Sequence, residues 1–186
     1  DPSIQGVLAE RRVAGTAVTL ALPGQDSTLL HHVVQLLRPG DLLVIDRLGD
    51  RKHACLGGGV ACAIKARGVV GVVIDGPCTD LPEIRTYDLP VWSRGTSPIT
   101  TRLYDIGGAF NVPIACGGAA VLPGWLVIAD VSGVVAIPPA EAEDDVAWAL
   151  GRQAAEPAMH ARLQADAMLG ELSGASAKVL AAVRDG

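Results

Sequence analysis

The chain has 186 residues, of which 49% are apolar and 19% are charged, and its formal net charge is −5. This length and apolar content predict one compact domain and exclude a disordered or fibrous chain. The acidic balance, with no cluster of Lys or Arg, argues against a nucleic-acid partner. We also expect no membrane span, because Gly, Asp or Pro interrupts every apolar run before it reaches the roughly 18 residues required.

Four cysteines stand at positions 55, 62, 78 and 116, and no two of them form a C-x-x-C pair. We therefore expect neither a zinc site nor a disulfide framework, but reduced thiols in a cytoplasmic protein. The chain begins at Asp1 and not at Met, so the sequence leaves open whether a targeting segment precedes it.

Strands and helices alternate in the first half of the chain. Residues 15–22 are β-branched and apolar, which predicts a buried strand. Cap candidates at 26–28 open a helix that continues with apolar residues at helical spacing to Leu37. The segment 42–46 is the next predicted strand.

The stretch 57–80 carries the strongest functional signal. It contains three glycines, a predicted helix over 57–67, a buried strand over 69–75 and a polar turn that ends at Asp80. This order brings backbone amides at a helix N-terminus close to side chains at a strand C-terminus, which is the usual geometry of a small-anion site. Asp80 and Glu83 also have the spacing of a capping box for the following helix.

The second half predicts shorter strands and a helical tail. Strands are expected at 91–92, 111–116, 125–129 and 134–137, the last after a turn at Ser132-Gly133. A helix should begin near Glu141 and kink or end at Pro157, with a further break between Gly170 and Gly174. These elements predict a single mixed α/β domain over 1–186, with helices on one side of a sheet and a helical tail at about 141–186.

Several motifs in this order resemble those of the RraA-like family, which includes class II pyruvate aldolases for 4-hydroxy-4-methyl-2-oxoglutarate and 4-carboxy-4-hydroxy-2-oxoadipate, and regulators of ribonuclease E activity. The matching pieces are residues 12–19 (RVAGTAVT), 38–46 (RPGDLLVID), the glycine loop with 65–68 (KARG), 72–76 (VVIDG), Asp80, 94–98 (RGTSP), 122–124 (LPG), 128–130 (IAD) and 133–138 (GVVAIP). The resemblance implies a β/β/α swivelling-domain sandwich that assembles as a homotrimer or hexamer, with active sites at subunit clefts.

The resemblance also implies site residues. Asp80 matches an aspartate that helps hold a divalent metal, Mg²⁺ or Mn²⁺, and is the one metal ligand expected. Residues 57–60 (Gly57, Gly58, Gly59 and Val60) match the loop whose amides bind the substrate carboxylate. The chain departs from the aldolase pattern twice, because Gly58 stands where the loop acid belongs and Thr79 stands where an arginine belongs.

These departures predict weakened aldolase chemistry. A neutral hydroxyl at Thr79 replaces a guanidinium, and a difference of about 2 kcal/mol in the transition state is about thirtyfold in rate. The polar segment before the glycine loop offers replacements beside Thr79 and Asp80. Arg47, Arg51 or Lys52 could supply the cation, with Arg47 expected to bind substrate and Arg51 to be catalytic, and His53 could be a proton shuttle. Alternatively, this segment is a solvated or subunit-contact loop and Asp80 only caps a helix.

Two classes of function follow. The first is a divergent lyase (class 4.1) acting on a small 2-oxo or hydroxy carboxylate, or another enzyme on the same scaffold, such as a decarboxylase, dehydratase or isomerase. The second is a non-catalytic binding protein of the ribonuclease-regulator type. A methyltransferase is rejected, because no G-x-G-x-x-G nucleotide fingerprint is present.

Overall fold

The computed structural model describes residues 1–8 and 10–184. These residues divide into two compact units, 1–140 and 141–186. The first unit holds the sheet and the helices α1 (Thr28–Val33), α2 (Gly58–Ala66) and α3 (Leu81–Thr86). The second unit is helical.

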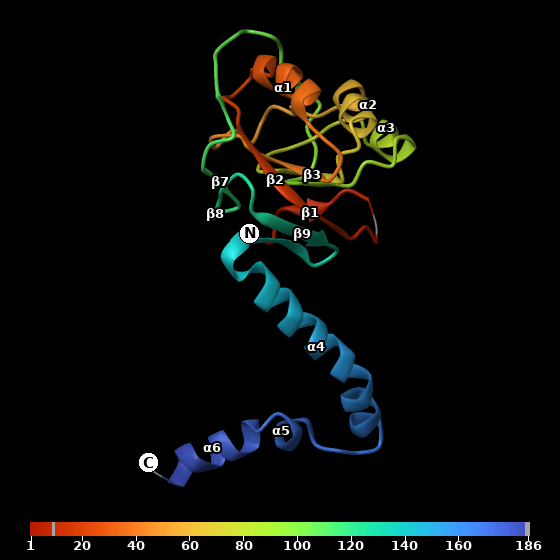
Figure 1. The fold of residues 1–186 in the computed structure, drawn as a ribbon, viewed down its shortest axis with the longest axis vertical. Coiled ribbons are helices and arrows are strands. Elements are labelled where there is room, and N and C mark those ends of the chain that lie inside the picture. Colours follow the sequence, from red (N-terminus) through yellow and green to blue (C-terminus); the bar gives the residue numbers. More distant parts are fainter. Residues whose placement is uncertain (9, 185–186) are drawn as a thin grey trace. The chain divides into compact units, whose positions relative to one another are not determined.

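A mixed eight-stranded sheet forms the centre of the first unit (Figure 1). Its order is β1-β5-β4-β3-β2-β9-β10, and β6 also pairs with β2. The neighbours β2, β3, β4 and β5 run parallel, whereas β1, β9 and β10 pair antiparallel. The strand bounds are β1 Gln5–Gly6, β2 Val13–Ala21, β3 Asp41–Asp46, β4 Gly71–Ile74, β5 Val91–Ser93, β6 Ala109–Phe110, β9 Leu126–Asp130 and β10 Gly133–Ile137.

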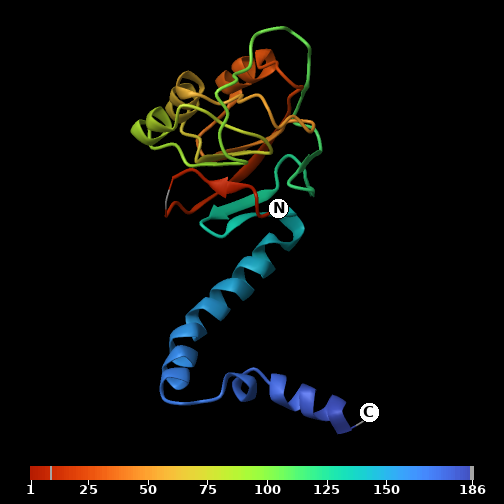
Figure 2. The same cartoon turned by 180° about the vertical axis from the view of Figure 1, so that it is seen from behind.

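The three helices cover one face of the sheet, as Figures 1 and 2 show from opposite sides. Leu43 and Ile45 of β3 belong to one buried cluster with Leu30 of α1, Ile64 of α2 and Ile84 of α3. This arrangement explains why β3 and β4 are almost continuously apolar, because strands covered on both faces do not alternate. The expected mixed α/β architecture is confirmed, with these helices on one side of the sheet.

The opposite face of the sheet carries a second cluster. Leu42 and Val44 of β3 pack there with Trp92, Ile114 and Val127. The hairpin of β7 (Ile114–Cys116) and β8 (Ala119–Val121) contributes to this cover. The strand expected over 111–116 is shorter than predicted, because Asn111 has a φ of +52°, outside the extended region.

The loops that follow the parallel strands β2, β3, β4 and β5 lie at one edge of the sheet. The loop after β5 forms backbone hydrogen bonds with each of the other three. We call residues 94–106 the crossing segment; it forms the long green excursion beside α1 in Figure 1. The amide of Cys78 donates to the carbonyl of Gly95 (3.0 Å), and that of Ala54 donates to Ile99 (2.8 Å). The amide of Arg102 donates to the carbonyl of Gln25 (2.9 Å). The crossing segment therefore runs over the carboxyl ends of β4, β3 and β2 in turn.

The second unit contains most of α4 (Pro139–Gln164), with α5 (Leu169–Leu172) and α6 (Ala175–Arg184). The expected break is present between α5 and α6, where Gly174 has a φ of +76°. Of the two effects predicted for Pro157, a kink or an end of the helix, the end is wrong, since α4 continues to Gln164. Pro157 removes only one helical N–H, and Gln153, whose carbonyl loses that partner, is exposed to water. None of the described helices is long and apolar enough to cross a membrane.

Candidate active site

A cavity of about 430 Å³ opens at the N-terminus of α2. Its walls come from α1, the glycine loop, the turn after β4 and the crossing segment. Six of the residues predicted from the sequence line it: Gly57, Gly58, Gly59, Val60, Thr79 and Asp80. The structure thus brings together the two ends of the stretch 57–80.

Two of the three glycines are required by close packing. A Cβ at Gly57 would lie 2.6 Å from Oδ2 of Asp80, and one at Gly58 would lie 2.9 Å from Cγ of Glu83. Both distances are too short for a real side chain. An acidic residue at position 58 is therefore incompatible with Glu83 in its present place on α3, which accounts physically for one departure from the aldolase pattern.

The third glycine, Gly59, faces open space, since a Cβ on this residue would meet nothing within 4 Å. The Ala61 amide donates to the carbonyl of Gly57 (2.9 Å), and the Gly58 amide donates to Asp80 (2.8 Å). The amides of Gly59 and Val60 have no hydrogen-bond partner within the described residues. Two helix N-terminal donors therefore stand free at the cavity, where the helix dipole favours an anion.

Asp80 turns its carboxylate across the cavity wall and does not cap its own helix. Oδ2 accepts the Gly58 amide at 2.8 Å, and Oδ1 accepts the Thr79 hydroxyl at 3.2 Å. The predicted capping box with Glu83 is wrong, because α3 has no side-chain cap bond. Asp80 has a φ of +54°, whereas a side-chain N-cap requires an extended backbone.

The polar side chains of residues 47–53 that were expected to supply replacement groups do not line the cavity. Arg47 is fully buried and donates to the carbonyls of Leu22 (3.3 Å) and Gly24. Its Nε is buried with no partner in the described part of the chain. Arg47 is not among the residues that line the cavity, and it instead ties the loop after β2 to the loop after β3.

Arg51 and His53 are likewise engaged away from the cavity lining. Arg51 forms an ion pair with Asp75 and also donates to the Asp75 carbonyl (3.2 Å). Nδ1 of His53 lies 2.7 Å from Oδ2 of Asp50, whose Oδ1 accepts the His53 amide at 2.8 Å. Burial raises the pKa of Asp50, but these bonds from His53 outweigh burial and hold that pKa below its usual value.

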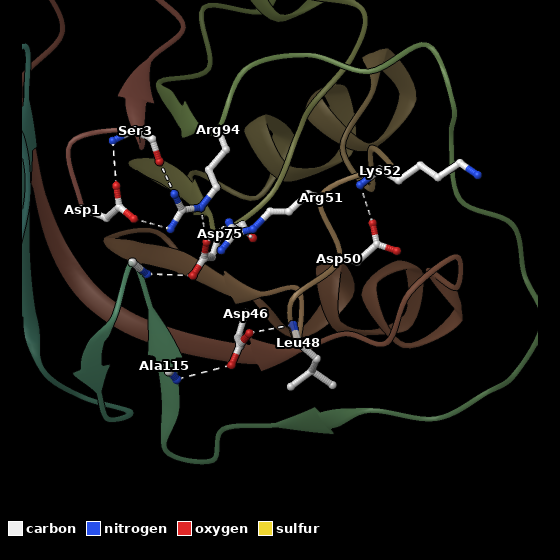
Figure 3. A network of polar contacts seen from close by, with 11 residues as sticks. Asp1, Ser3, Asp46, Leu48, Asp50, Arg51, Lys52, Asp75, Arg94 and Ala115 are labelled. Carbon is white, nitrogen blue, oxygen red and sulfur yellow. Dashed lines mark hydrogen bonds and ion pairs between the residues drawn. The ribbon is translucent and has the colours of Figure 1, made fainter.

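Asp75 is the centre of a second polar cluster, shown in Figure 3. It lies between Arg51 and Arg94, both of which contact Oδ1, and its Oδ2 accepts the Gly117 amide at 2.8 Å. Arg94 also lies 2.9 Å from Oδ2 of Asp1. Every polar atom of the Asp75 carboxylate is therefore occupied, and the cluster joins the turn after β4 to distant parts of the chain.

Sequence reasoning missed several residues that line the cavity. They are His31, Cys55 and Arg102, with the hydroxyl residues Ser27, Thr100 and Thr101. Burial raises the pKa of Cys55 to about 11, so this thiol is neutral at pH 7 and is not an activated nucleophile. No local pattern in the sequence singles out Arg102, because hydrogen bonds to Gln25 and Ser27, distant in the sequence, hold it at this edge of the sheet.

The donor set fits one loosely held divalent cation. No cluster of three or more His, Cys, Asp or Glu side chains suited to a metal is present in the described ranges. Asp80 offers a single carboxylate to the cavity. Mg²⁺ is commonly bound through one or two carboxylates and otherwise keeps water or substrate oxygens, and Mn²⁺ has similar ligand preferences.

The chain is similar in sequence and fold to proteins of one known family. The model of the family "RraA-like: Aldolase/RraA" matches residues 1–136. A protein from Halalkalibacterium halodurans named "Putative 4-hydroxy-4-methyl-2-oxoglutarate aldolase" is 33% identical over 147 residues, which are 79% of this chain and 70% of that protein.

Two solved structures have the same fold. Streptomyces coelicolor RraAS2, described as an unusual member of the RNase ES inhibitor RraA protein family, matches with a TM-score of 0.75 and 32% identity over 84% of this chain and 80% of its own. The RNA-processing inhibitor RraA from Thermus thermophilis matches with a TM-score of 0.68 and 28% identity, covering 73% and 82%. With the family model and these relatives in agreement, the chain belongs to the RraA-like family.

Proposed function

We propose that this protein is a lyase of the aldolase type that acts on a small 2-oxo or hydroxy carboxylate in the cavity at the α2 N-terminus. The observation that carries the proposal is the pair of free amides, Gly59 and Val60, on the same cavity as the carboxylate of Asp80. The amides suit a carboxylate group of the substrate. Asp80 suits a divalent cation beside it.

The substrate is positioned by backbone more than by side chains. A carboxylate on the Gly59 and Val60 amides would be oriented by donors that belong to a helix and do not need to be reorganised. The absence of a Cβ at Gly59 lets the substrate approach the backbone closely. The glycine loop thus serves both packing, at Gly57 and Gly58, and ligand access.

Asp80 and Thr79 form the side-chain part of the proposed site. Asp80 would hold Mg²⁺ or Mn²⁺, which when bound polarises a 2-oxo group as a Lewis acid. The Gly58 amide and the Thr79 hydroxyl fix the orientation of the Asp80 carboxylate. Since Thr79 cannot give the bidentate, charged contact of an arginine, it acts in this proposal through Asp80.

The expected assembly and compartment are part of the same proposal. Large apolar side chains of the crossing segment are exposed beside the cavity: Ile99, Leu103, Tyr104 and Ile106. Contiguous exposed apolar residues mark interaction surfaces, which supports a homotrimer or hexamer with the cavity near a subunit boundary. All four cysteines are free thiols, in keeping with a cytoplasmic location.

Release of pyruvate from 4-hydroxy-4-methyl-2-oxoglutarate and related 2-oxo and hydroxy acids tests the proposal, with lactate dehydrogenase and NADH as the readout. We expect turnover that requires Mg²⁺ or Mn²⁺ and falls at least about 100-fold in Asp80→Asn. Asp88→Asn is the matched control, because Asp88 is an exposed carboxylate paired with Arg11. Absence of turnover for every acid tested would contradict a lyase of this type.

A second candidate is a non-catalytic regulator of a ribonuclease. It is favoured by the two structural relatives that are described as RNase or RNA-processing inhibitors. Inhibition of a ribonuclease E-type enzyme by this protein, unchanged in Asp80→Asn and without a metal effect, would support this candidate. A decarboxylase, dehydratase or isomerase on the same cavity would instead keep the dependence on Asp80 and release no pyruvate.

A further inference from the structure

The wall of the cavity includes an acidic side chain before any substrate enters. Asp80 is its only carboxylate side chain among the described lining residues, and its Oδ2 already accepts one of the amides at the α2 N-terminus. A substrate carboxylate on the neighbouring amides of Gly59 and Val60 would therefore be placed near a like charge. Such a pair is unfavourable in a partly enclosed site unless a cation lies beside it.

Arg102 is the one permanently charged cation among the residues that line this cavity in the described part of the chain. Its Nη1 donates to Oγ1 of Thr100 (2.6 Å) and to the carbonyl of Thr101 (2.9 Å), and both of these residues also line the cavity. Within the described residues Nε and Nη2 have no partner. Arg102 thus keeps donors available for a bidentate contact with an anion.

The backbone of Arg102 is fixed more firmly than that of an ordinary surface loop. Its amide donates to the carbonyl of Gln25, and its own carbonyl accepts the Ser27 amide, both at 2.9 Å. Beneath it, the fully buried carboxylate of Asp26 accepts the amides of Tyr104 (3.0 Å) and Ile106 (2.8 Å). These hydrogen bonds fix the backbone on both sides of Arg102, so its side chain starts from a preorganised position beside the cavity.

We propose that Arg102 is the substrate-binding cation of this protein, and that it compensates from the crossing segment for the arginine missing at position 79. The ligand is a small carboxylate anion, bound between the Gly59 and Val60 amides and the Arg102 guanidinium. The inference rests on the proposed function, because it assigns a residue to the same cavity. It explains how Thr79 is tolerated there without loss of the positive charge that a carboxylate requires.

The test is calorimetric titration of the full chain with oxalate in the presence of Mg²⁺. We expect Arg102→Gln to raise the oxalate Kd about 10- to 100-fold, as for loss of a charged hydrogen-bonding partner. Arg102→Lys keeps the charge but loses the bidentate geometry, so its oxalate Kd should lie between those of the unmodified protein and Arg102→Gln. Arg85→Gln removes an exposed arginine of α3 that does not line the cavity, and it should change nothing.

Salt dependence separates a binding role from a purely structural one. If Arg102 contacts the anion, the oxalate affinity of Arg102→Gln should fall less steeply with NaCl than that of Arg85→Gln. Equal affinities and equal salt slopes in these two variants would overturn the role of Arg102 and leave the proposed function standing. Failure of the unmodified protein to bind oxalate would overturn the proposed function, and the role of Arg102 with it.

Discussion

The turn after β4 has a carboxylate at each end, and the two have opposite surroundings. Asp75, at the start, lies between two arginines and also accepts the Gly117 amide (Figure 3). Asp80, at the end, is exposed on a cavity and shares its wall with two free amides. Both oxygens of Asp75 are occupied by strong contacts within the protein, whereas the carboxylate of Asp80 is exposed and can still accept contacts from a ligand. This difference separates a structural acid from a candidate functional one more clearly than residue type does.

Asp75→Asn should have the largest effect on stability. It removes one of the two carboxylates that pair with Arg94, whose side chain is only 13% exposed, and leaves that of Asp1. Breaking a buried ion pair in this way costs about 3 kcal/mol. Urea denaturation measures the loss, with Asp88→Asn as the control, because its pair with Arg11 is exposed and contributes about 1 kcal/mol at most. Equal stability of the two variants would show that Asp75 is not a structural centre.

Asp26→Asn should lower stability by about 2 kcal/mol at pH 7. Burial raises the pKa of Asp26, but the Thr28 hydroxyl and the amides of Tyr104, Thr28 and Ile106 outweigh it and hold the pKa well below its usual value. The asparagine side chain has one oxygen and one NH2 group, so its NH2 group would face one of these N–H or O–H donors without forming a hydrogen bond.

The depressed pKa of Asp26 also predicts a pH dependence. The Asp26 carboxylate contributes its full stabilisation above the pKa of an ordinary aspartate, which is about 4. This contribution is lost as the pH falls toward the lower pKa that Asp26 has in the folded protein. Between pH 6 and pH 3 the unmodified protein should therefore lose stability more steeply than Asp26→Asn. Parallel curves for the two proteins would contradict the assigned role of the carboxylate.

Gly58→Ala tests the packing of α2 on α3. The new Cβ would lie 2.9 Å from Cγ of Glu83, so we expect a cost of about 1–2 kcal/mol. Glu83→Ala removes this Cγ but keeps Cβ of residue 83, which lies 3.0 Å from the new Cβ, so only part of the cost should disappear in that background. Thermal unfolding of the four proteins measures the effect as a double-mutant cycle. Gly59→Ala is the matched control, since its Cβ would meet nothing within 4 Å. Additive effects of the two substitutions would exclude the contact.

Thr79→Val should have the smallest effect. It removes the 3.2 Å bond from the Thr79 hydroxyl to Oδ1 of Asp80 and keeps the shape of the side chain. We expect oxalate to bind about three- to tenfold more weakly in the presence of Mg²⁺, with no change in the unfolding midpoint. A loss of 100-fold or more would mean that Thr79 contacts the ligand directly.

Local patterns were sufficient for most of the fold. Three features have a local physical cause and were predicted: the apolar runs of β3 and β4, the glycines at the start of α2 and the break at Gly174. The failures depended on backbone details that a sequence does not display. Asn111 and Asp80 adopt positive φ angles, which shortened one strand and removed one predicted helix cap.

The candidate site divides in the same way. Residues 57–60 and Asp80 belong to one contiguous stretch, so their position on one cavity could be expected from the sequence, whereas their roles in binding remain a proposal. Arg102 could not be placed without the tertiary structure, because it reaches the cavity through bonds to Gln25 and Ser27, far away in the sequence. Arg51 was predicted as a catalytic cation from its closeness in sequence to the glycine loop, yet its ion pair is with Asp75.

We propose that the Asp80 end of the turn is a metal-assisted carboxylate site. Calorimetric titration of oxalate, with and without Mg²⁺, into the unmodified protein and Asp80→Asn tests it most directly. We predict saturable binding that weakens at least about 100-fold without Mg²⁺ or in Asp80→Asn, while the stability of this variant stays within about 1 kcal/mol because its side-chain oxygen still accepts the Gly58 amide. Oxalate binding that is independent of both Mg²⁺ and Asp80 would contradict the claim.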